Sequence, residues 1–123
     1  MSKYIAVDGA TLKLSAGTAT GKEITSSPSS NSKIEGNGIY NGTINVKISG
    51  FVGSTVATQT GGGLGSIDGT ASKTKVDGNP VVLKGDESGD ILITGNYANG
   101  NPGAQETITV SIDDPGQNLW KAE

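Results

Sequence analysis

The stretch that decides the fold is "KVDGNPVVLKGD", residues 75–86. An apolar residue leads into Asp77-Gly78-Asn79-Pro80, a near-continuous β-type run follows, and Gly85-Asp86 closes it. Glycine supplies the positive φ that a tight turn needs, and proline fixes the backbone beside it. The stretch therefore predicts a β-hairpin.

Apolar and polar residues alternate with period two in several other places. The run "TINVKIS" (43–49) puts Ile44, Val46 and Ile48 on one face. Short β-branched runs of this kind are typical of half-buried strands, and no longer window has a helical period. The sequence predicts an all-β fold, a small single domain of short antiparallel strands. The same alternation recurs at Leu12, Leu14, Ile91, Ile93, Ile108, Val110 and Ile112.

Turn signals separate these runs. Asp-Gly or Asn-Gly steps begin at residues 8, 37, 41, 68, 77 and 99, and each predicts a tight turn. Residues 24–32, 58–66 and 96–106 are expected to be loops. The Gly-rich stretch 58–66 is either flexible or a place where backbones approach too closely for side chains.

Composition limits the function. The chain has 123 residues, of which 20 are glycine, with three Tyr, one Trp and one Phe. So few large apolar groups predict a thin core, completed by a partner or by repeated backbone pairing. Nine Lys against twelve acids, with no arginine, give a net charge of −3, so we expect no nucleic acid as partner.

Membranes and export signals are not indicated either. No apolar stretch reaches spanning length, so we expect no stable membrane insertion. The start "MSKYIAVDGA" lacks the apolar region of a signal peptide, and we expect synthesis in the cytoplasm without one.

Catalytic groups are scarce. Without His or Cys the chain has no Ser–His or Cys–His nucleophile, and we expect no catalysis, no cofactor and no transition metal. The dense acids are Asp86, Glu87 and Asp90, and the pair Asp113-Asp114. Solvated turn acids are the expected role, and calcium or magnesium at the first three stays open. The sequence therefore predicts a structural protein. Two classes compete: a β-sandwich binding or capsid/tail decoration module, and a cap that finishes a larger β assembly.

Three patches resemble PAAR-like proteins, which cap the spike of contractile injection machines such as type VI secretion systems and contractile phage tails. They are "VDGATLKLSAGT" (7–18), "VDGNPVVLKGD" (76–86) and "ITVSIDDPGQ" (108–117), in the family's order. The residues that carry the resemblance are Gly9, Ala10, Leu12, Leu14, Gly17, Gly78, Pro80, Val81, Gly85, Asp86, Pro115 and Gly116.

The sequence also departs from the family. The Pro-Ala-Ala-Arg string is absent, the His and Cys that usually hold a metal at the tip are missing, and Leu14 stands where the subgroup often has Cys. Residues 19–75 match nothing in the family and are expected to build an insert.

The resemblance implies a cone-shaped fold that sharpens the tip of a trimeric β-helical spike and helps to puncture a target envelope. It implies one cap per spike trimer, function at the tip of an injection apparatus or virion, and an effector as a further partner. In this interpretation the hairpin 75–86 is a wall of the cone. The residues expected at three partner-facing edges, or in the core just above them, are Ile44, Val46, Ile48, Val81, Leu83, Ile108, Val110 and Ile112.

Overall fold

The computed structural model describes residues 2–123, which form thirteen β-strands and no helix, so the all-β expectation is confirmed. The first seven strands are β1 (Lys3–Tyr4), β2 (Leu12–Leu14), β3 (Thr18–Ile24), β4 (Lys33–Ile34), β5 (Asn37–Gly38), β6 (Thr43–Val52) and β7 (Ala57–Asp68). The other six are β8 (Lys75–Val76), β9 (Asn79–Pro80), β10 (Ile91–Asn96), β11 (Pro102–Ile108), β12 (Val110–Ile112) and β13 (Lys121–Ala122). Residues 2–123 include no helix long and apolar enough to cross a membrane.

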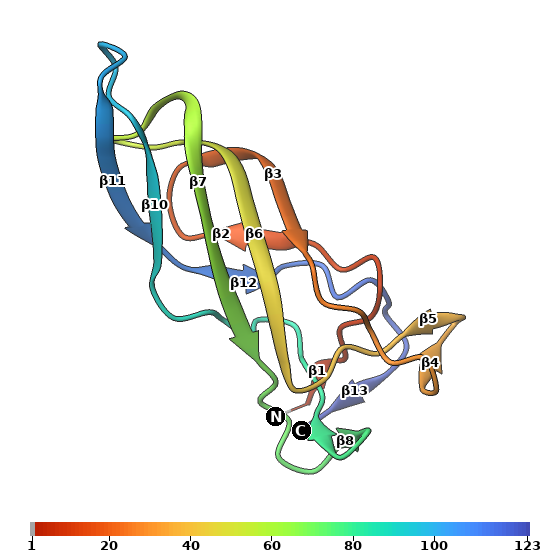
Figure 1. The fold of residues 1–123 in the computed structure, drawn as a ribbon. Helices are drawn as coiled ribbons and strands as arrows, with labels where there is room; N and C mark the ends of the chain where they lie inside the picture. Colours follow the sequence, from red (N-terminus) through yellow and green to blue (C-terminus); the bar gives the residue numbers. More distant parts are fainter. Residues whose placement is uncertain (1) are drawn as a thin grey trace.

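The long strands form one antiparallel sheet of five, in the order β11-β10-β7-β6-β3. A short ladder of β12 and β2 crosses behind it (Figure 1). The alternating residues of β6, with Ile44, Val46 and Ile48 at 1% exposure each, face this ladder across the main core, to which Leu12 and Ile112 also belong. Period-two patterning thus produces one buried and one solvated face, as expected for an antiparallel sheet.

The Gly-rich stretch 58–66 is not a loop but the middle of β7, the longest strand. A Cβ on Gly61 would lie 2.8 Å from both Ile93 Cγ2 and Phe51 Cβ, and one on Gly63 would lie 2.7 Å from the Leu92 carbonyl oxygen. Of the two interpretations of this stretch, close approach of the backbone is therefore the one that the structure supports.

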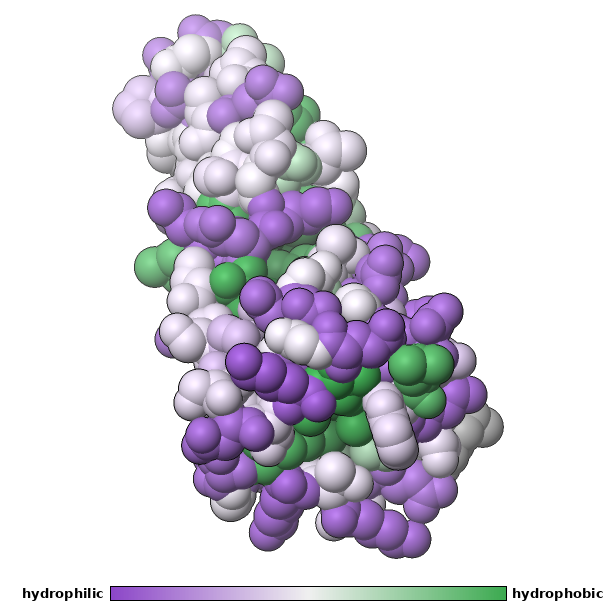
Figure 2. All heavy atoms as spheres, turned by 90° about the vertical axis from the view of Figure 1, so that its right-hand side faces the viewer, coloured by the Kyte–Doolittle hydropathy of each residue, from purple (hydrophilic) through white to green (hydrophobic). Residues whose placement is uncertain are grey.

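Three two-stranded ribbons project at one end of the molecule, and we call them arms. Arm A pairs β1 with β13, arm B pairs β4 with β5, and arm C pairs β8 with β9. They lie at the end opposite the β10–β11 turn, and the molecule narrows toward that turn (Figure 1 and Figure 2). The first and last strands, β1 and β13, thus meet at the arm end.

Between one arm and the next, the chain leaves this end and returns, and each excursion contributes strands to the wall around the main core. The first contributes β2 and β3, the second β6 and β7, and the third β10 to β12. Residues 19–75, expected as an insert, thus supply two central strands of the sheet and arm B. The hairpin predicted over residues 75–86 is shorter than expected: only 75–76 and 79–80 pair, and they form arm C instead of a wall around the main core.

Candidate functional site: a base with pseudo-threefold symmetry

Three short extended segments, centred on Ala6, Tyr40 and Val82, meet where the arms join the rest of the molecule. Their backbones form a closed cycle of hydrogen bonds. The N–H of Ala6 donates to the carbonyl of Val82 (2.8 Å), that of Val82 to Tyr40 (2.9 Å), and that of Tyr40 to Ala6 (3.0 Å). Each segment donates to one neighbour and accepts from the other, which is the pattern of a threefold-symmetric object.

Two further sets of backbone hydrogen bonds follow the same symmetry. Within each arm the pairs, donor first, are Ile5 to Trp120 (3.0 Å), Ile39 to Ser32 (3.0 Å) and Val81 to Thr74 (3.2 Å). Between neighbouring arms they are Asp8 to Gly38 (2.9 Å), Gly42 to Pro80 (2.8 Å) and Lys84 to Tyr4 (2.8 Å). Residues 3–8, 37–42 and 79–84 are therefore structural equivalents. We call the arms and these three segments together the base.

The base has a core of its own because side chains alternate along each segment. Ala6, Tyr40 and Val82, the three centres, belong to the main core. Their apolar neighbours along the chain point to the other side, away from the main core, and form a second cluster inside the base. That cluster contains Ile5, Val7, Ile34, Ile39, Ala71, Val81, Leu83 and Ala122.

Tyr40 is the polar member of the central cycle. Burial raises the pKa of its phenol, and the nearby charge of Asp8 and a hydrogen bond from the phenol to this carboxylate (3.5 Å) raise it further. The hydroxyl therefore stays neutral and acts as a donor, which suits a packing role.

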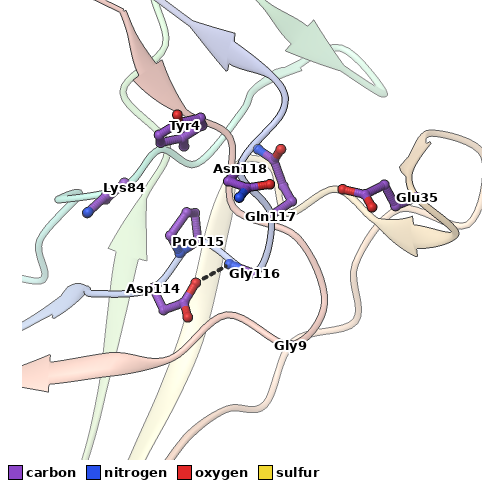
Figure 3. Close-up of a pocket in the computed structure, with 9 residues that line it drawn as sticks. All are labelled: Tyr4, Gly9, Glu35, Lys84, Asp114, Pro115, Gly116, Gln117 and Asn118. Atoms are coloured by element: carbon purple, nitrogen blue, oxygen red, sulfur yellow. Dashed lines mark hydrogen bonds between the residues drawn. The ribbon is translucent and has the colours of Figure 1, made fainter.

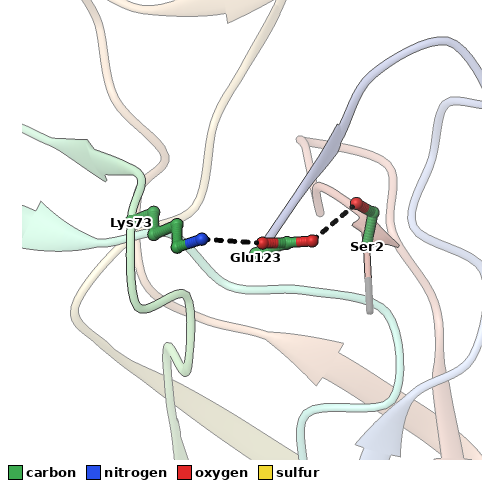
Figure 4. A network of polar contacts seen from close by, with 3 residues as sticks. All are labelled: Ser2, Lys73 and Glu123. Carbon is green, nitrogen blue, oxygen red and sulfur yellow. Dashed lines mark hydrogen bonds and ion pairs between the residues drawn. The ribbon is translucent and has the colours of Figure 1, made fainter.

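Two arms end in the same turn, and the third has none. Glu35-Gly36 has φ angles of 53° and 82°, and Asp77-Gly78 has 53° and 81°, as the primed two-residue hairpin turn requires. In arm A, Glu123 and Ser2 stand at this position (Figure 4). There the Ser2 hydroxyl donates to Glu123 (3.5 Å), which also pairs with Lys73 (3.2 Å).

Sequence reasoning found one arm and missed the symmetry. "KIEGNGI" (33–39) and "KVDGNPV" (75–81) match in pattern, and this signal was available. The third copy is split between the two chain ends, so no repeat of fixed period exists. The turn predicted at Asn37-Gly38 was wrong, because these residues form β5 and the turn lies at Glu35-Gly36.

The two C-terminal family-like patches hold the base together. Asp86, 4% exposed, accepts the backbone N–H of Leu83 (2.8 Å) and of Thr70 (3.1 Å), and the Thr70 hydroxyl. The Gln117 amide donates to the carbonyls of Ile5 and Trp120 (2.8 Å each), and its carbonyl accepts from the N–H of Leu119 (2.7 Å) and Trp120 (2.8 Å). The adjoining Pro115 is buried, and Gly116 has a φ of 87°.

The N-terminal patch, residues 7–18, runs from the base into the wall. Gly9 has a φ of 100°, Ala10 packs against the main core, and Leu12 and Leu14 form the β12–β2 ladder with Ile112 and Val110. Gly17, with a φ of 72°, lies so close to the Phe51 ring that a Cβ there would be 2.6 Å from it.

Of the two places expected for the eight residues named above, a partner-facing edge or the core, the structure puts them in the core. Ile44, Val46 and Ile48 lie in β6, while Ile108, Val110 and Ile112 lie in β11 and β12, all within the wall. Only Val81 and Leu83 belong to the base. All eight side chains are buried, so they form cores and leave no apolar edge for a partner.

The acidic residues do not assemble into an ion site. Asp86 is occupied by the hydrogen bonds above, and Glu87 accepts from the Thr109 hydroxyl (3.3 Å). Within residues 2–123, no three side chains of the His, Cys, Asp or Glu type lie close enough to hold a metal.

A polar cavity of about 690 Å³ opens beside arm A and the turn of arm B (Figure 3). Its lining includes Glu35, Lys84 and Asp114, with no nucleophile–base pair. Comparisons with protein-family models, curated proteins and solved structures gave no match for this chain.

Proposed function

We propose that this protein is a structural cap on a trimeric β-helical spike of a contractile injection machine, with one chain per spike trimer. The observation that carries the proposal is the pseudo-threefold base, in which three sets of three backbone hydrogen bonds relate the arms to one another. The cap sharpens the spike and helps it to puncture a target envelope.

Threefold symmetry is the physical reason why the base fits the end of a trimeric spike. A trimer presents three identical ends, and strands that end there leave unpaired backbone groups that attract further strands. One chain can satisfy all three ends alike only if it offers three equivalent edges. The outer strands β4, β8 and β13 are such edges, since each pairs on one side with the inner strand of its arm.

The opposite end of the molecule suits a tip. The β10–β11 turn is tied by hydrogen bonds from the Tyr97 N–H to the Asn101 carbonyl (2.8 Å) and from the Gly100 N–H to the Tyr97 carbonyl (2.9 Å). A narrow, internally bonded turn facing away from a docked base is what puncture requires. The chain contributes no chemistry in this role, which is purely mechanical.

A binding module, including a capsid or tail decoration protein, is the rival. A glycan-binding surface usually presents aromatic side chains together. Here the exposed Trp120 lies by arm A and the exposed Tyr97 lies at the narrow end, so they form no common platform.

The test is a titration of the cap against a trimeric β-helical spike, read by light scattering. We expect one cap per three spike chains. Lys33, Lys75 and Lys121 are exposed at equivalent positions on the three outer strands, so Lys33→Glu, Lys75→Glu and Lys121→Glu should weaken docking by similar factors. Lys47→Glu, on the outer face of β6, is the control and should dock normally.

Two results would overturn the proposal. One is a ratio of one cap per spike chain, or no complex with the spike. The other is a complex in which only one of the three equivalent lysines matters, because an ordinary asymmetric binding site would behave in that way.

A further inference from the structure

A second cavity, of about 380 Å³, lies against arm A and breaks the symmetry of the base. Ser2, Lys3, Tyr4, Lys84, Gly85 and Lys121 line it. Three of these described residues are lysines and none is an acid. The Lys121 ammonium also lies 4.7 Å from the centre of the Tyr4 ring. The lining is therefore positively charged, although the chain as a whole has a net charge of −3.

The equivalent positions on the other arms show that the base does not need this charge. Asn37 and Asn79 stand where arm A has Lys3, and Gly42 and Asp8 stand where Lys84 is. The position of Lys121 differs, because the other arms also have lysine there, at Lys33 and Lys75. Since the threefold hydrogen bonds form equally well without Lys3 and Lys84, their charges are available for a ligand that arm A alone receives.

Among residues 2–123, no acid lines the hollow. Within residues 2–123 the ion pair of the structure is Lys73–Glu123, which involves none of these three lysines. Ser2 on the rim contacts Glu123, whose charge is already opposed by Lys73 (Figure 4).

Two exposed apolar side chains directly precede Lys121 in the sequence. Leu119 and Trp120 immediately precede Lys121 and are 63% and 61% exposed, two of the most exposed large apolar side chains of the described residues. Their backbone is held in place by Gln117, so the exposure belongs to an ordered loop. A lining with three lysines, followed along the chain by exposed apolar side chains, suits a ligand that combines carboxylates with an apolar side chain.

We propose that this hollow binds a short acidic peptide segment of a partner protein, with its carboxylates on Lys3, Lys84 and Lys121 and an apolar side chain against Trp120. A nucleic acid or an anionic membrane fits less well, since both present extended negative surfaces that the acidic remainder of the chain would repel. The site shares Lys121 with the arm A edge that the proposed function uses, whereas Lys3 and Lys84 lie outside the three outer strands.

The experiment uses the single tryptophan, Trp120, as reporter. The whole protein is titrated with the peptide acetyl-Asp-Glu-Leu-Asp-Glu-amide and with its neutral counterpart acetyl-Asn-Gln-Leu-Asn-Gln-amide. We expect only the acidic peptide to change the fluorescence, with binding that weakens as salt is raised. The triple variant Lys3→Gln/Lys84→Gln/Lys121→Gln should bind about tenfold more weakly, since three exposed charge pairs are lost.

The matched control is Lys13→Gln/Lys22→Gln/Lys47→Gln, which removes the same total charge from exposed positions outside the base and should bind like the parent. Thermal melting checks that both variants fold, and the single variant Lys84→Gln serves if the triple variant does not. Absence of binding by the parent protein, equal loss in both triple variants, or a preference for a DNA oligonucleotide or phosphatidylglycerol vesicles would each overturn the inference. Spike docking is measured separately, so either proposal can fail alone.

Discussion

At the scale of single residues, Gln117 is the side chain on which the base depends most. It is 8% exposed and makes four hydrogen bonds, all to backbone groups of arm A or of the loop that leads into it. The two strands of arm A are not joined by a turn. The Gln117 amide therefore helps to hold them together, as the turns Glu35-Gly36 and Asp77-Gly78 do in the other arms.

Gln117→Met, which keeps the volume but removes the hydrogen bonds, should lower the free energy of unfolding by about 3 kcal/mol, because buried backbone groups are left unsatisfied. Chemical denaturation followed by circular dichroism measures the change. Asn118→Ala, at the exposed neighbouring position, should stay within about 0.5 kcal/mol of the parent. An equally stable Gln117→Met protein would contradict this role.

Asp-Gly and Asn-Gly steps predicted a turn correctly in arm C but not in arm B. Asp77-Gly78 was predicted as a turn and is one. Asn37-Gly38 has the same turn chemistry, yet the turn forms two residues earlier, at Glu35-Gly36. With the turn at Glu35-Gly36, Ile34 pairs with Asn37, and Ile34 and Ile39 are both buried in the second cluster.

At the scale of elements, alternation predicted the strands that have β-branched side chains on one face. β6, β10 and β12 were found in this way. β7 was not, because its inward positions are glycines that leave room for Ile91, Ile93 and Phe51 from neighbouring strands. The inward side of β7 is defined by the side chains of neighbouring strands, so the sequence of β7 itself has no alternating hydrophobic pattern.

The two faces of β7 give a matched pair of substitutions at adjacent positions. Gly61→Ala should cost about 1–3 kcal/mol of unfolding free energy, since its Cβ would overlap Phe51, Val56 and Ile93 in a packed core. Gly62→Ala, whose Cβ would meet only the Ile48 carbonyl at 3.5 Å, should be neutral or stabilise by about 0.5 kcal/mol. Urea denaturation of both variants measures the difference, and equal stabilities would mean that close packing does not explain the glycines.

At the scale of the whole molecule, the sequence indicated the fold class but not the symmetry. The three arms have related patterns, but Lys121–Ala122 and Lys3–Tyr4 of arm A lie at opposite ends of the chain and meet only after folding. The two ends meet only because three long segments between the arms fold back in the correct register. The local sequence at either end does not indicate this.

The symmetry predicts where the chain can be cut and rejoined. If arm A is a hairpin without its turn, then Glu123 and Ser2 occupy the two turn positions that Glu35 and Gly36 fill in arm B. A circular permutant that joins Glu123 directly to residue 2, with Ser2→Gly to allow the positive φ, restores this turn. Its new ends open between Glu35 and Gly36, so arm B becomes the open arm.

This permutant should fold to the same structure with an unfolding free energy within about 1 kcal/mol of the parent, since closing one hairpin and opening another have similar loop entropies. Circular dichroism and chemical denaturation measure this. The control carries the same join but opens inside β6, between Ile48 and Ser49, where the new ends interrupt the central ladder, and it should fail to fold. Failure of the first permutant, or equal stability of both, would show that the arms are not equivalent, and the case for a threefold docking base would fall with it.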